Sequence, residues 1–332
     1  MSNREIKAEQ LVKRYGDFTA VNGVSFHVQS GEVFGFLGAN GAGKSTTVSM
    51  LTTLGLPTAG HATVGGYDVH REAAQVRRIA GVALQEIGLD PIMKPMELLT
   101  IQAQTFGMSR KQARQRAEEL LELVKLSDFV DRAVGKYSGG MRRRLDLAMA
   151  LVHEPDILFL DEPTTGLDPA SRRDVWVEVR RLNREQGMTI FLTTQYLEEA
   201  DELADRIAII DKGEIVAEGQ PEALKAEVGG EAINITFNDS EVVQKARAEL
   251  ATMAERTQID RHTLRLYLKD AAARVPTVVN RLQSANINME KLSLTQPTLD
   301  DVFLQVTGQR YEATGDDAQA PTETDIDSDV AA

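Results

Sequence analysis

A glycine-rich segment near the N-terminus has the residues needed to hold a chain of phosphates. It reads Gly38-Ala39-Asn40-Gly41-Ala42-Gly43-Lys44-Ser45, and it fits the phosphate-loop pattern at every fixed position. Glycines let backbone N–H groups approach phosphate oxygens, and the following helix adds the positive end of its dipole. Lys44 would supply a charge for the β- and γ-phosphates, and Ser45 a hydroxyl for Mg²⁺. The candidate nucleotide ligands in this loop are Gly38, Asn40, Gly41, Ala42, Gly43, Lys44, Ser45 and Thr46.

A pair of acidic residues ends an apolar run farther along the chain, Ile157-Leu158-Phe159-Leu160-Asp161-Glu162. Asp161 would hold Mg²⁺ directly or through water, and Glu162 would polarise an attacking water. Two acids after an apolar strand are weak evidence alone, because a solvated strand end has the same pattern. Together with the phosphate loop they predict hydrolysis of a nucleoside triphosphate, with Lys44 and Glu162 as catalytic residues.

These residues need strands that bring them to one edge of a sheet. Residues 33–37, 157–160 and 190–193 are short apolar runs typical of buried strands. Residues 86–150 break the alternation of strands and helices, and Ser109 followed by Gln112 predicts a capping box there. We therefore expect an α/β domain over residues 1–228, with an inserted helical subdomain at about 86–150.

The C-terminal third has a different organisation. Gly229-Gly230 marks a boundary, after which strand patterns around Ile233, Leu266 and Ile287 alternate with helical ones. This β-α-β-α-β order predicts a small α+β domain over residues 229–308, in which Thr298 and Asp301 could cap a last short helix. Residues 309–332 are acidic and lack apolar periodicity, so we expect a disordered tail, solvated rather than binding a partner.

Tyr137-Ser138-Gly139-Gly140-Met141, which precedes the acidic pair, resembles the signature motif of ABC ATPases. The phosphate loop and acidic strand stand in the order that this family has. The resemblance implies an ATPase in which Ser138, Gly139 and Gly140 bind the γ-phosphate held by the other subunit of a head-to-tail dimer. Met141 stands where the family more often has glutamine. Because backbone groups and the serine make the contacts there, we expect little effect.

Four more residues match family positions. Tyr15 resembles the aromatic residue that stacks on adenine, although a tyrosine at such a turn could also belong to the core. Gln85 resembles the glutamine that contacts Mg²⁺, and Asp168 the key residue of a loop that crosses the dimer interface. Gln195 stands where most of the family has a catalytic histidine. It can donate an amide N–H to the γ-phosphate but cannot carry a proton.

Three further segments resemble daunorubicin/doxorubicin-resistance-type ATP-binding proteins of bacterial multidrug exporters: residues 193–201, 141–146 and 293–304. This resemblance implies a homodimer that binds ATP and Mg²⁺ and energises efflux of a drug or lipid-like compound. The membrane-spanning part would be a separate permease of about six spans, and the chain would lie on the cytoplasmic face of the membrane through it. The expected permease contact lies near Gln85 and includes Ile87, Leu89, Ile92, Met93 and Met96, although each of these residues could equally pack in the core.

Composition limits the other possibilities. A net charge of −13 argues against broad contact with nucleic acid, and the absence of cysteine excludes disulfides and thiolate metal sites. The N-terminus lacks a signal-peptide core and no run approaches about 18 apolar residues, so we expect a soluble chain. An importer, a regulatory ATP-binding protein that barely hydrolyses ATP, and an ABC ATPase acting on ribosomes or DNA stay as alternatives.

Overall fold

A six-stranded sheet forms the centre of the larger lobe. The computed structural model describes residues 4–228, 231–268, 270–295 and 297–308. The sheet has the order β10-β9-β3-β8-β7-β6, and all its neighbours are parallel except the edge pair β9–β10. Every residue of β3, β7 and β8 is buried, as their apolar runs predict. The strands span Val33–Leu37 (β3), Ala80–Ala83 (β6), Ile157–Asp161 (β7), Thr189–Thr194 (β8), Arg206–Asp211 (β9) and Glu214–Gly219 (β10).

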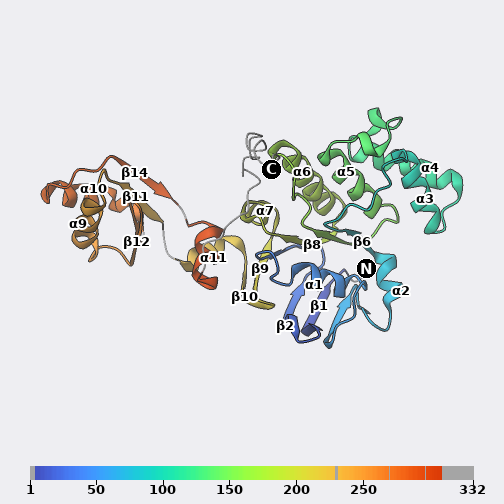
Figure 1. Ribbon diagram of the computed structural model, residues 1–332, viewed down its shortest axis with the longest axis horizontal. Helices are drawn as coiled ribbons and strands as arrows, with labels where there is room; N and C mark the ends of the chain where they lie inside the picture. The colour runs from blue at the N-terminus through green and yellow to red at the C-terminus, as the bar shows by residue number, and fades with distance from the viewer. Residues whose placement is uncertain (1–3, 229–230, 269, 296, 309–332) are drawn as a thin grey trace, which may run out of the picture.

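An antiparallel sheet of order β2-β1-β4-β5 faces this central sheet. Its strands are Ile6–Tyr15 (β1), Phe18–Val28 (β2), Ala59–Val64 (β4) and Tyr67–Asp68 (β5). Helix α1 (Lys44–Leu51) contacts strands of both sheets and lies between them (Figure 1). The ring of Phe26 lies 5.6 Å from those of both Phe34 and Phe191, so aromatic packing joins the two sheets.

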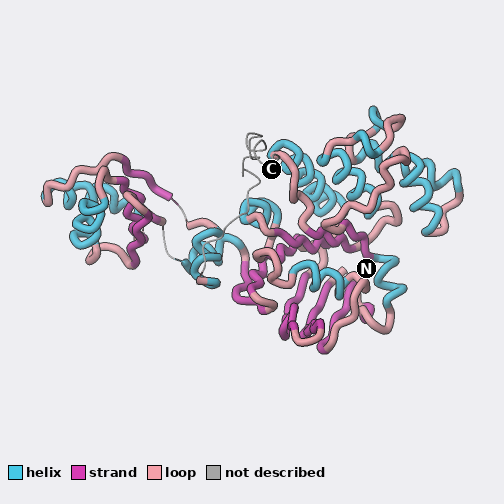
Figure 2. The backbone as a smooth tube through the Cα atoms, in the orientation of Figure 1, coloured by secondary structure: helices cyan, strands magenta, loops and turns pink. Residues whose placement is uncertain are grey.

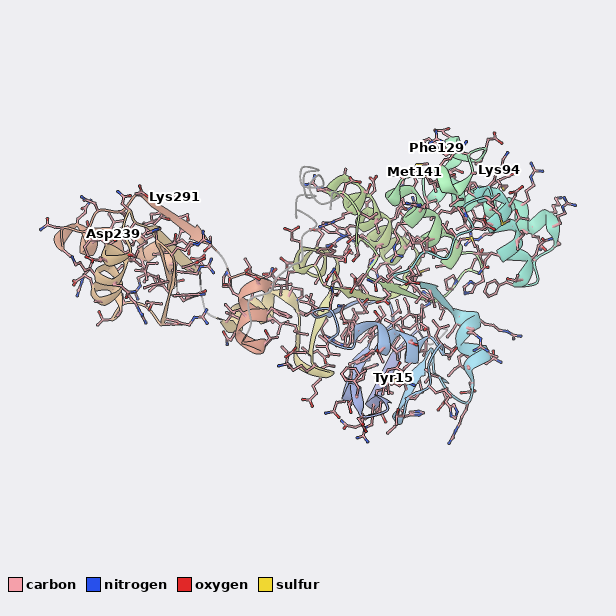
Figure 3. The ribbon with its side chains drawn as sticks, viewed as in Figure 1. Tyr15, Lys94, Phe129, Met141, Asp239 and Lys291 are labelled. Carbon is pink, nitrogen blue, oxygen red and sulfur yellow. The ribbon has the colours of Figure 1, made fainter. Side chains whose placement is uncertain are left out.

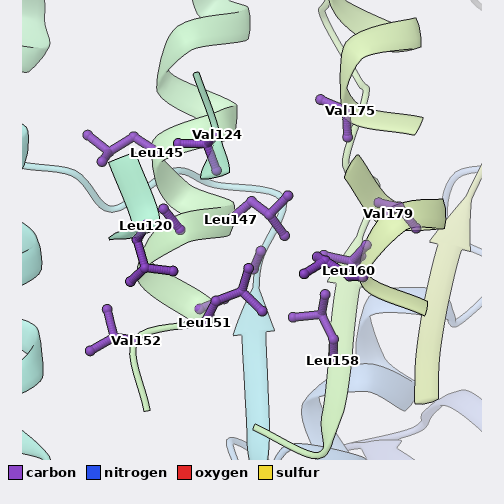
Figure 4. Packing of buried hydrophobic residues seen from close by; sticks show 14 of the residues in the cluster. Leu120, Val124, Leu145, Leu147, Leu151, Val152, Leu158, Leu160, Val175 and Val179 are labelled. Carbon is purple, nitrogen blue, oxygen red and sulfur yellow. The ribbon is translucent and has the colours of Figure 1, made fainter. Parts of the chain in front are cut away.

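Helices cover the other face of the central sheet (Figure 2). Ser109 and Gln112 form the expected capping box at the start of α4. Leu120 of α4, Leu147 of α5, Leu158 of β7 and Val179 of α6 share one core cluster (Figure 4). These helices are α3 (Pro95–Thr105), α4 (Arg110–Leu123), α5 (Gly139–Ala150), α6 (Pro169–Gln186), α7 (Leu197–Leu203) and α8 (Pro221–Val228), with short 3₁₀ turns at Ser127–Phe129 and Val134–Lys136. Helix α2 (Ala73–Ile79) instead joins the core between the two sheets through Val76.

The C-terminal domain has four antiparallel strands, where the sequence pattern predicted three. The strand that was missed, β12, carries mostly polar residues and forms a sheet edge, so no apolar alternation marks it. The element order β-α-β-β-α-β and the strand order β12-β13-β11-β14 define a ferredoxin-like topology. The elements are β11 (Ala232–Thr236), α9 (Ser240–Leu250), β12 (Arg256–Asp260), β13 (Thr263–Tyr267), α10 (Ala271–Ser284) and β14 (Lys291–Thr295).

The last helix, α11 (Leu299–Thr307), packs on the larger lobe although its sequence position grouped it with the small domain. Its apolar face contacts α7 and α8, and Phe303 joins a core cluster with Ile209 and Leu224. Thr298 and Asp301 form the expected capping box. Asp301 also pairs with Arg265 of β13 at 2.7 Å, so α11 contacts both parts of the chain. The predicted tail over residues 309–332 lies outside the described residues.

Candidate active site

The phosphate loop follows β3 and curls over the start of α1. A Cβ atom at Gly38 would lie 2.6 Å from the carbonyl oxygen of Ile210, and one at Gly43 would lie 2.6 Å from that of Ala20. Gly43 also has a φ of 107°, a conformation that side chains rarely adopt. These two positions therefore require glycine for steric reasons that are independent of any ligand, while Asn40 and Gly41 at the tip stay exposed.

Lys44 is buried and lies against the acidic strand end. Its ammonium group donates to the carbonyls of Gly38 and Ala39 at 2.9 and 3.1 Å and lies 3.0 Å from Glu162 Oε1. Only 4% of Lys44 and 5% of Glu162 are exposed, so solvent screens this ion pair weakly. The two predicted catalytic side chains are thus in direct contact.

Glu162 is held by several segments at once. Its other carboxylate oxygen accepts from Gln85 Nε2 at 3.2 Å and from the Thr165 hydroxyl at 3.1 Å. Its backbone has a φ of 47°, which is uncommon for a residue with a side chain and is often found at functional sites. The surrounding contacts hold its carboxylate beside Lys44 at the carboxyl edge of the sheet.

Asp161 and Ser45 form the second polar contact of the site. The Ser45 hydroxyl donates to Asp161 Oδ1 at 3.2 Å, and Thr193 donates to the same oxygen. The Thr193 hydroxyl also accepts from the Glu162 amide at 3.1 Å. Sequence reasoning missed Thr193 as a site residue. The signal that could have found it is the hydroxyl that ends the apolar run 190–193, since β8 pairs Thr193 with Asp161.

Among the described residues, neither Tyr15 nor Gln195 makes a side-chain hydrogen bond to this cluster. Tyr15 ends β1 with 55% of its surface exposed, and the ammonium of Lys13 lies 5.1 Å from its ring centroid. It is therefore not a core residue, and its ring is accessible for stacking. Gln195 is 9% exposed and sits between the end of β8 and the start of α7.

Ser138, Gly139 and Gly140 begin α5 away from the phosphate loop. Ser138 is the N-cap, its hydroxyl accepts from the Met141 amide at 3.2 Å, and both Ser138 and Gly139 are exposed. Within the described ranges no hydrogen bond joins these residues to the loop. Figure 3 shows Met141 and Tyr15 well apart in the lobe. The structure thus assembles two separate surfaces in one chain.

Asp168 has a structural role that its sequence assignment did not include. It is the N-cap of α6 and accepts from the amides of Ala170 and Ser171 at 3.1 and 3.0 Å. The Ser171 hydroxyl donates to its second oxygen at 2.6 Å, and this bond is the main reason that the pKa of Asp168 lies below its usual value. The carboxylate is exposed beside Gly166 and orders the start of α6.

Comparisons with known proteins show the family of the chain. Residues 21–165 match the family described as ABC transporter, and residues 219–307 match the C-terminal domain of DrrA1-3-like ATP-binding proteins. A daunorubicin resistance ATP-binding protein of Streptomyces coeruleorubidus is 45% identical over 93% of this chain and 97% of its own length. A Nod factor export ATP-binding protein of Burkholderia thailandensis is 43% identical over 94% of this chain and 100% of its own.

Among solved structures, a dimeric ATP-binding cassette in a post-hydrolysis state with ADP and Pi has a TM-score of 0.60 and 27% identity. The match covers 65% of this chain and 98% of that one. The fold and site define the ATP-hydrolysing subunit of an ABC transporter, in which hydrolysis is coupled to transport. Within that class, the chain belongs to the daunorubicin-resistance-type ATP-binding proteins.

Proposed function

We propose that two copies of this chain form the motor of an exporter that moves a hydrophobic drug or lipid-like compound through a separate permease. The observation that carries the proposal is the division of the site. Lys44, Gln85 and Glu162 converge at the phosphate loop, whereas Ser138 and Gly139 are exposed elsewhere. An N-capped helix end suits an anion. Head-to-tail pairing would place the start of α5 in each chain against the γ-phosphate that its partner binds. ATP would then bridge a homodimer.

The hydrolytic step follows from the contacts of Lys44. An incoming triphosphate would compete with the Glu162 carboxylate for the Lys44 ammonium group, because both are anions that pair with the same cation. The released carboxylate could then polarise water, while the amide of Gln195 donates to a γ-phosphate oxygen. ATP stabilises the closed dimer only because it contacts both chains there, and its hydrolysis removes that differential affinity.

Ser45 and Asp161 fit the Mg²⁺ ion that would accompany ATP. Both offer hard oxygen donors, and the two oxygens lie 3.2 Å apart. Magnesium in nucleotide sites keeps water and phosphate ligands and needs few protein ones, which explains why the described ranges contain no cluster of three metal-binding side chains. Gln85 would be a third protein contact. When bound, the ion would neutralise charge on the β- and γ-oxygens.

Gln195→His is expected to keep or raise the rate of hydrolysis. A histidine could donate the same hydrogen bond and would add a protonatable group, which the amide of Gln195 lacks. The pH–rate profile of the variant should gain a step near pH 6.5 that the wild type does not show. Phosphate release measured from pH 5.5 to 8.5 checks both points. A large loss of activity would count against the assignment of Gln195.

The permease would dock beside the Gln85 segment. A cavity of about 330 Å³ opens there, lined among others by Leu89, Phe106, Met149 and His153. Of the apolar residues expected to form this contact, Leu89 and Met96 pack partly against the core, whereas Ile92 is 84% exposed. An exposed isoleucine three residues beyond Leu89, which lines this cavity, suits a contact with a short helix of a membrane partner.

Ile92→Glu is expected to reduce co-purification of the permease about tenfold or more, because a charge would enter an apolar contact. Because the Ile92 side chain is exposed, the substitution should not lower the melting temperature of the chain. Quantitative mass spectrometry of detergent extracts measures the ratio of permease to tagged chain. Val177→Glu, at a residue of α6 that is 56% exposed, is the matched control and should keep the wild-type ratio. Equal recovery with both variants would place the docking site elsewhere.

The similar relatives differ in substrate, since one is a daunorubicin resistance protein and another a Nod factor export protein. None of the helices in the described ranges has the length and apolar character that crossing a membrane requires. We propose that the permease holds the chain on the cytoplasmic face of the membrane, as the family resemblance implies. The test is a pull-down of the tagged chain from detergent-solubilised cells. A stoichiometric multi-span protein would support the proposal, whereas ribosomal proteins or DNA factors without one would overturn it.

A further inference from the structure

Arg143 is a buried arginine that the hydrolytic scheme above does not use. It lies in the first turns of α5, and only 4% of its surface is exposed. Burying a guanidinium costs free energy unless its N–H groups donate hydrogen bonds. The acceptors that Arg143 contacts therefore indicate its role. Each of its three nitrogens has at least one hydrogen-bond acceptor.

Those acceptors belong to the two segments that carry the hydrolytic side chains. Nε donates to the carbonyl of Pro163 at 2.8 Å, and Nη2 donates to that of Asp161 at 3.0 Å. These two carbonyls flank Glu162, whose own φ is 47°. Nη1 donates to the carbonyl of Leu84 at 2.5 Å, directly before Gln85. The planar guanidinium group of Arg143 therefore fixes the backbone on both sides of Glu162 and the backbone that leads to Gln85.

The same helix offers its N-terminal end to solvent. Ser138 caps α5 and is exposed, while Arg143 lies just over one turn farther along. A helix turn is stiff, so a displacement of the helix end moves the guanidinium with it. Gly140 packs closely on α6, since a Cβ atom there would lie 2.5 Å from the Ser171 hydroxyl oxygen, so the start of α5 would move together with α6.

We propose that Arg143 is a positioning residue that links the exposed start of α5 to the hydrolytic segments of its own chain. Engagement of Ser138 and Gly139 by the nucleotide of a partner would thereby adjust Glu162 and Gln85. The two ATP sites of a dimer would thus be coupled through this side chain. The coupling rests on the proposed head-to-tail dimer, whereas the positioning of Glu162 does not.

A simpler role for Arg143 would be to neutralise Asp146. The two side chains pair at 3.1 Å, and burial raises the pKa of Asp146 to about 6. Asp146→Asn separates the two roles, because it removes the charge of the partner but leaves the three carbonyl contacts in place. If the hydrogen bonds to the three carbonyls position Glu162, Asp146→Asn should keep the wild-type kcat. If the ion pair matters, it should behave like a variant of Arg143.

The test compares Arg143→Lys with Asp146→Asn in ATP titrations of phosphate release. Lysine keeps the charge but cannot reach acceptors on two segments with a planar fork. We expect kcat to fall about 10- to 100-fold, as for misplaced catalytic groups, with the dissociation constant for ATP within twofold of wild type. The Hill coefficient for ATP should fall towards 1. Arg114→Lys, in an exposed ion pair on α4, is the matched control and should match the wild type.

A double variant, Arg143→Gln/Asp146→Asn, guards against misfolding because it leaves no buried unpaired charge. It should stay folded at the assay temperature, although the three carbonyls lose their donor, and it should lose kcat as Arg143→Lys does. Wild-type kcat in both Arg143 variants, or an equal loss in Asp146→Asn, would overturn the proposal. A wild-type Hill coefficient of 1 would contradict the coupling between the two sites, while the kcat comparison would still decide the positioning of Glu162.

Discussion

Glu162→Gln is expected to bind ATP, to hydrolyse it about 10²- to 10⁴-fold more slowly, and to accumulate as an ATP-bound dimer. The range is what a general base typically contributes. Affinity for ATP should rise, because Glu162 Oε1 lies 3.0 Å from the Lys44 ammonium and competes with phosphate for it. The neutral amide of the variant competes less for the Lys44 ammonium group, so the triphosphate should bind more tightly there.

Three measurements check this prediction: phosphate release, equilibrium binding of ATP, and light scattering after gel filtration with and without ATP. Glu185→Gln, at an exposed carboxylate of α6, is the matched control and should behave as the wild type in all three. A Glu162→Gln protein that stays monomeric with ATP and retains full activity would overturn both the base assignment and the proposed dimer. A slow monomer would contradict the dimer alone.

Residues that act through local sequence could be predicted. A phosphate loop needs its glycines, lysine and serine at fixed spacing, and Gly38 and Gly43 meet steric limits set by the turn itself. Ser109 with Gln112, and Thr298 with Asp301, lie three residues apart, so their capping boxes could also be found from spacing. The two strand-end acids could be placed because parallel strands bring their carboxyl ends to one edge.

Residues that act across the fold could not be predicted. Thr193 meets Asp161 only because β8 pairs with β7, and Arg143 reaches Leu84 across 59 positions of sequence. The packing of α11 on α7 and α8 is of the same kind, since an amphipathic helix does not indicate which core it will join. The contact between Lys44 and Glu162 likewise depends on how α1 and β7 meet in space.

Lys44→Ala is expected to weaken ATP binding and to lower the free energy of unfolding. The ammonium group is the buried cation at the phosphate loop and would donate to the β- and γ-phosphates. Losing a hydrogen bond between charged groups costs about 1.5–3 kcal/mol, so ATP affinity should fall roughly 10- to 100-fold. Hydrolysis should fall about 10²- to 10³-fold, as when one preorganised donor is removed. Calorimetry with ATP and Mg²⁺, and phosphate release, measure the two effects.

The nucleotide-free protein gives an independent check of the same contact. Lys44→Ala leaves Glu162 buried without its cation, which should lower the free energy of unfolding by about 3 kcal/mol. Lys44→Ala/Glu162→Gln removes the orphaned charge, so it should recover most of that loss in urea unfolding without recovering ATP binding. Lys245→Ala, at an exposed lysine of α9, should change neither quantity. A double variant no more stable than Lys44→Ala would show that the ion pair does not stabilise the fold, and wild-type ATP affinity in Lys44→Ala would exclude Lys44 from the site.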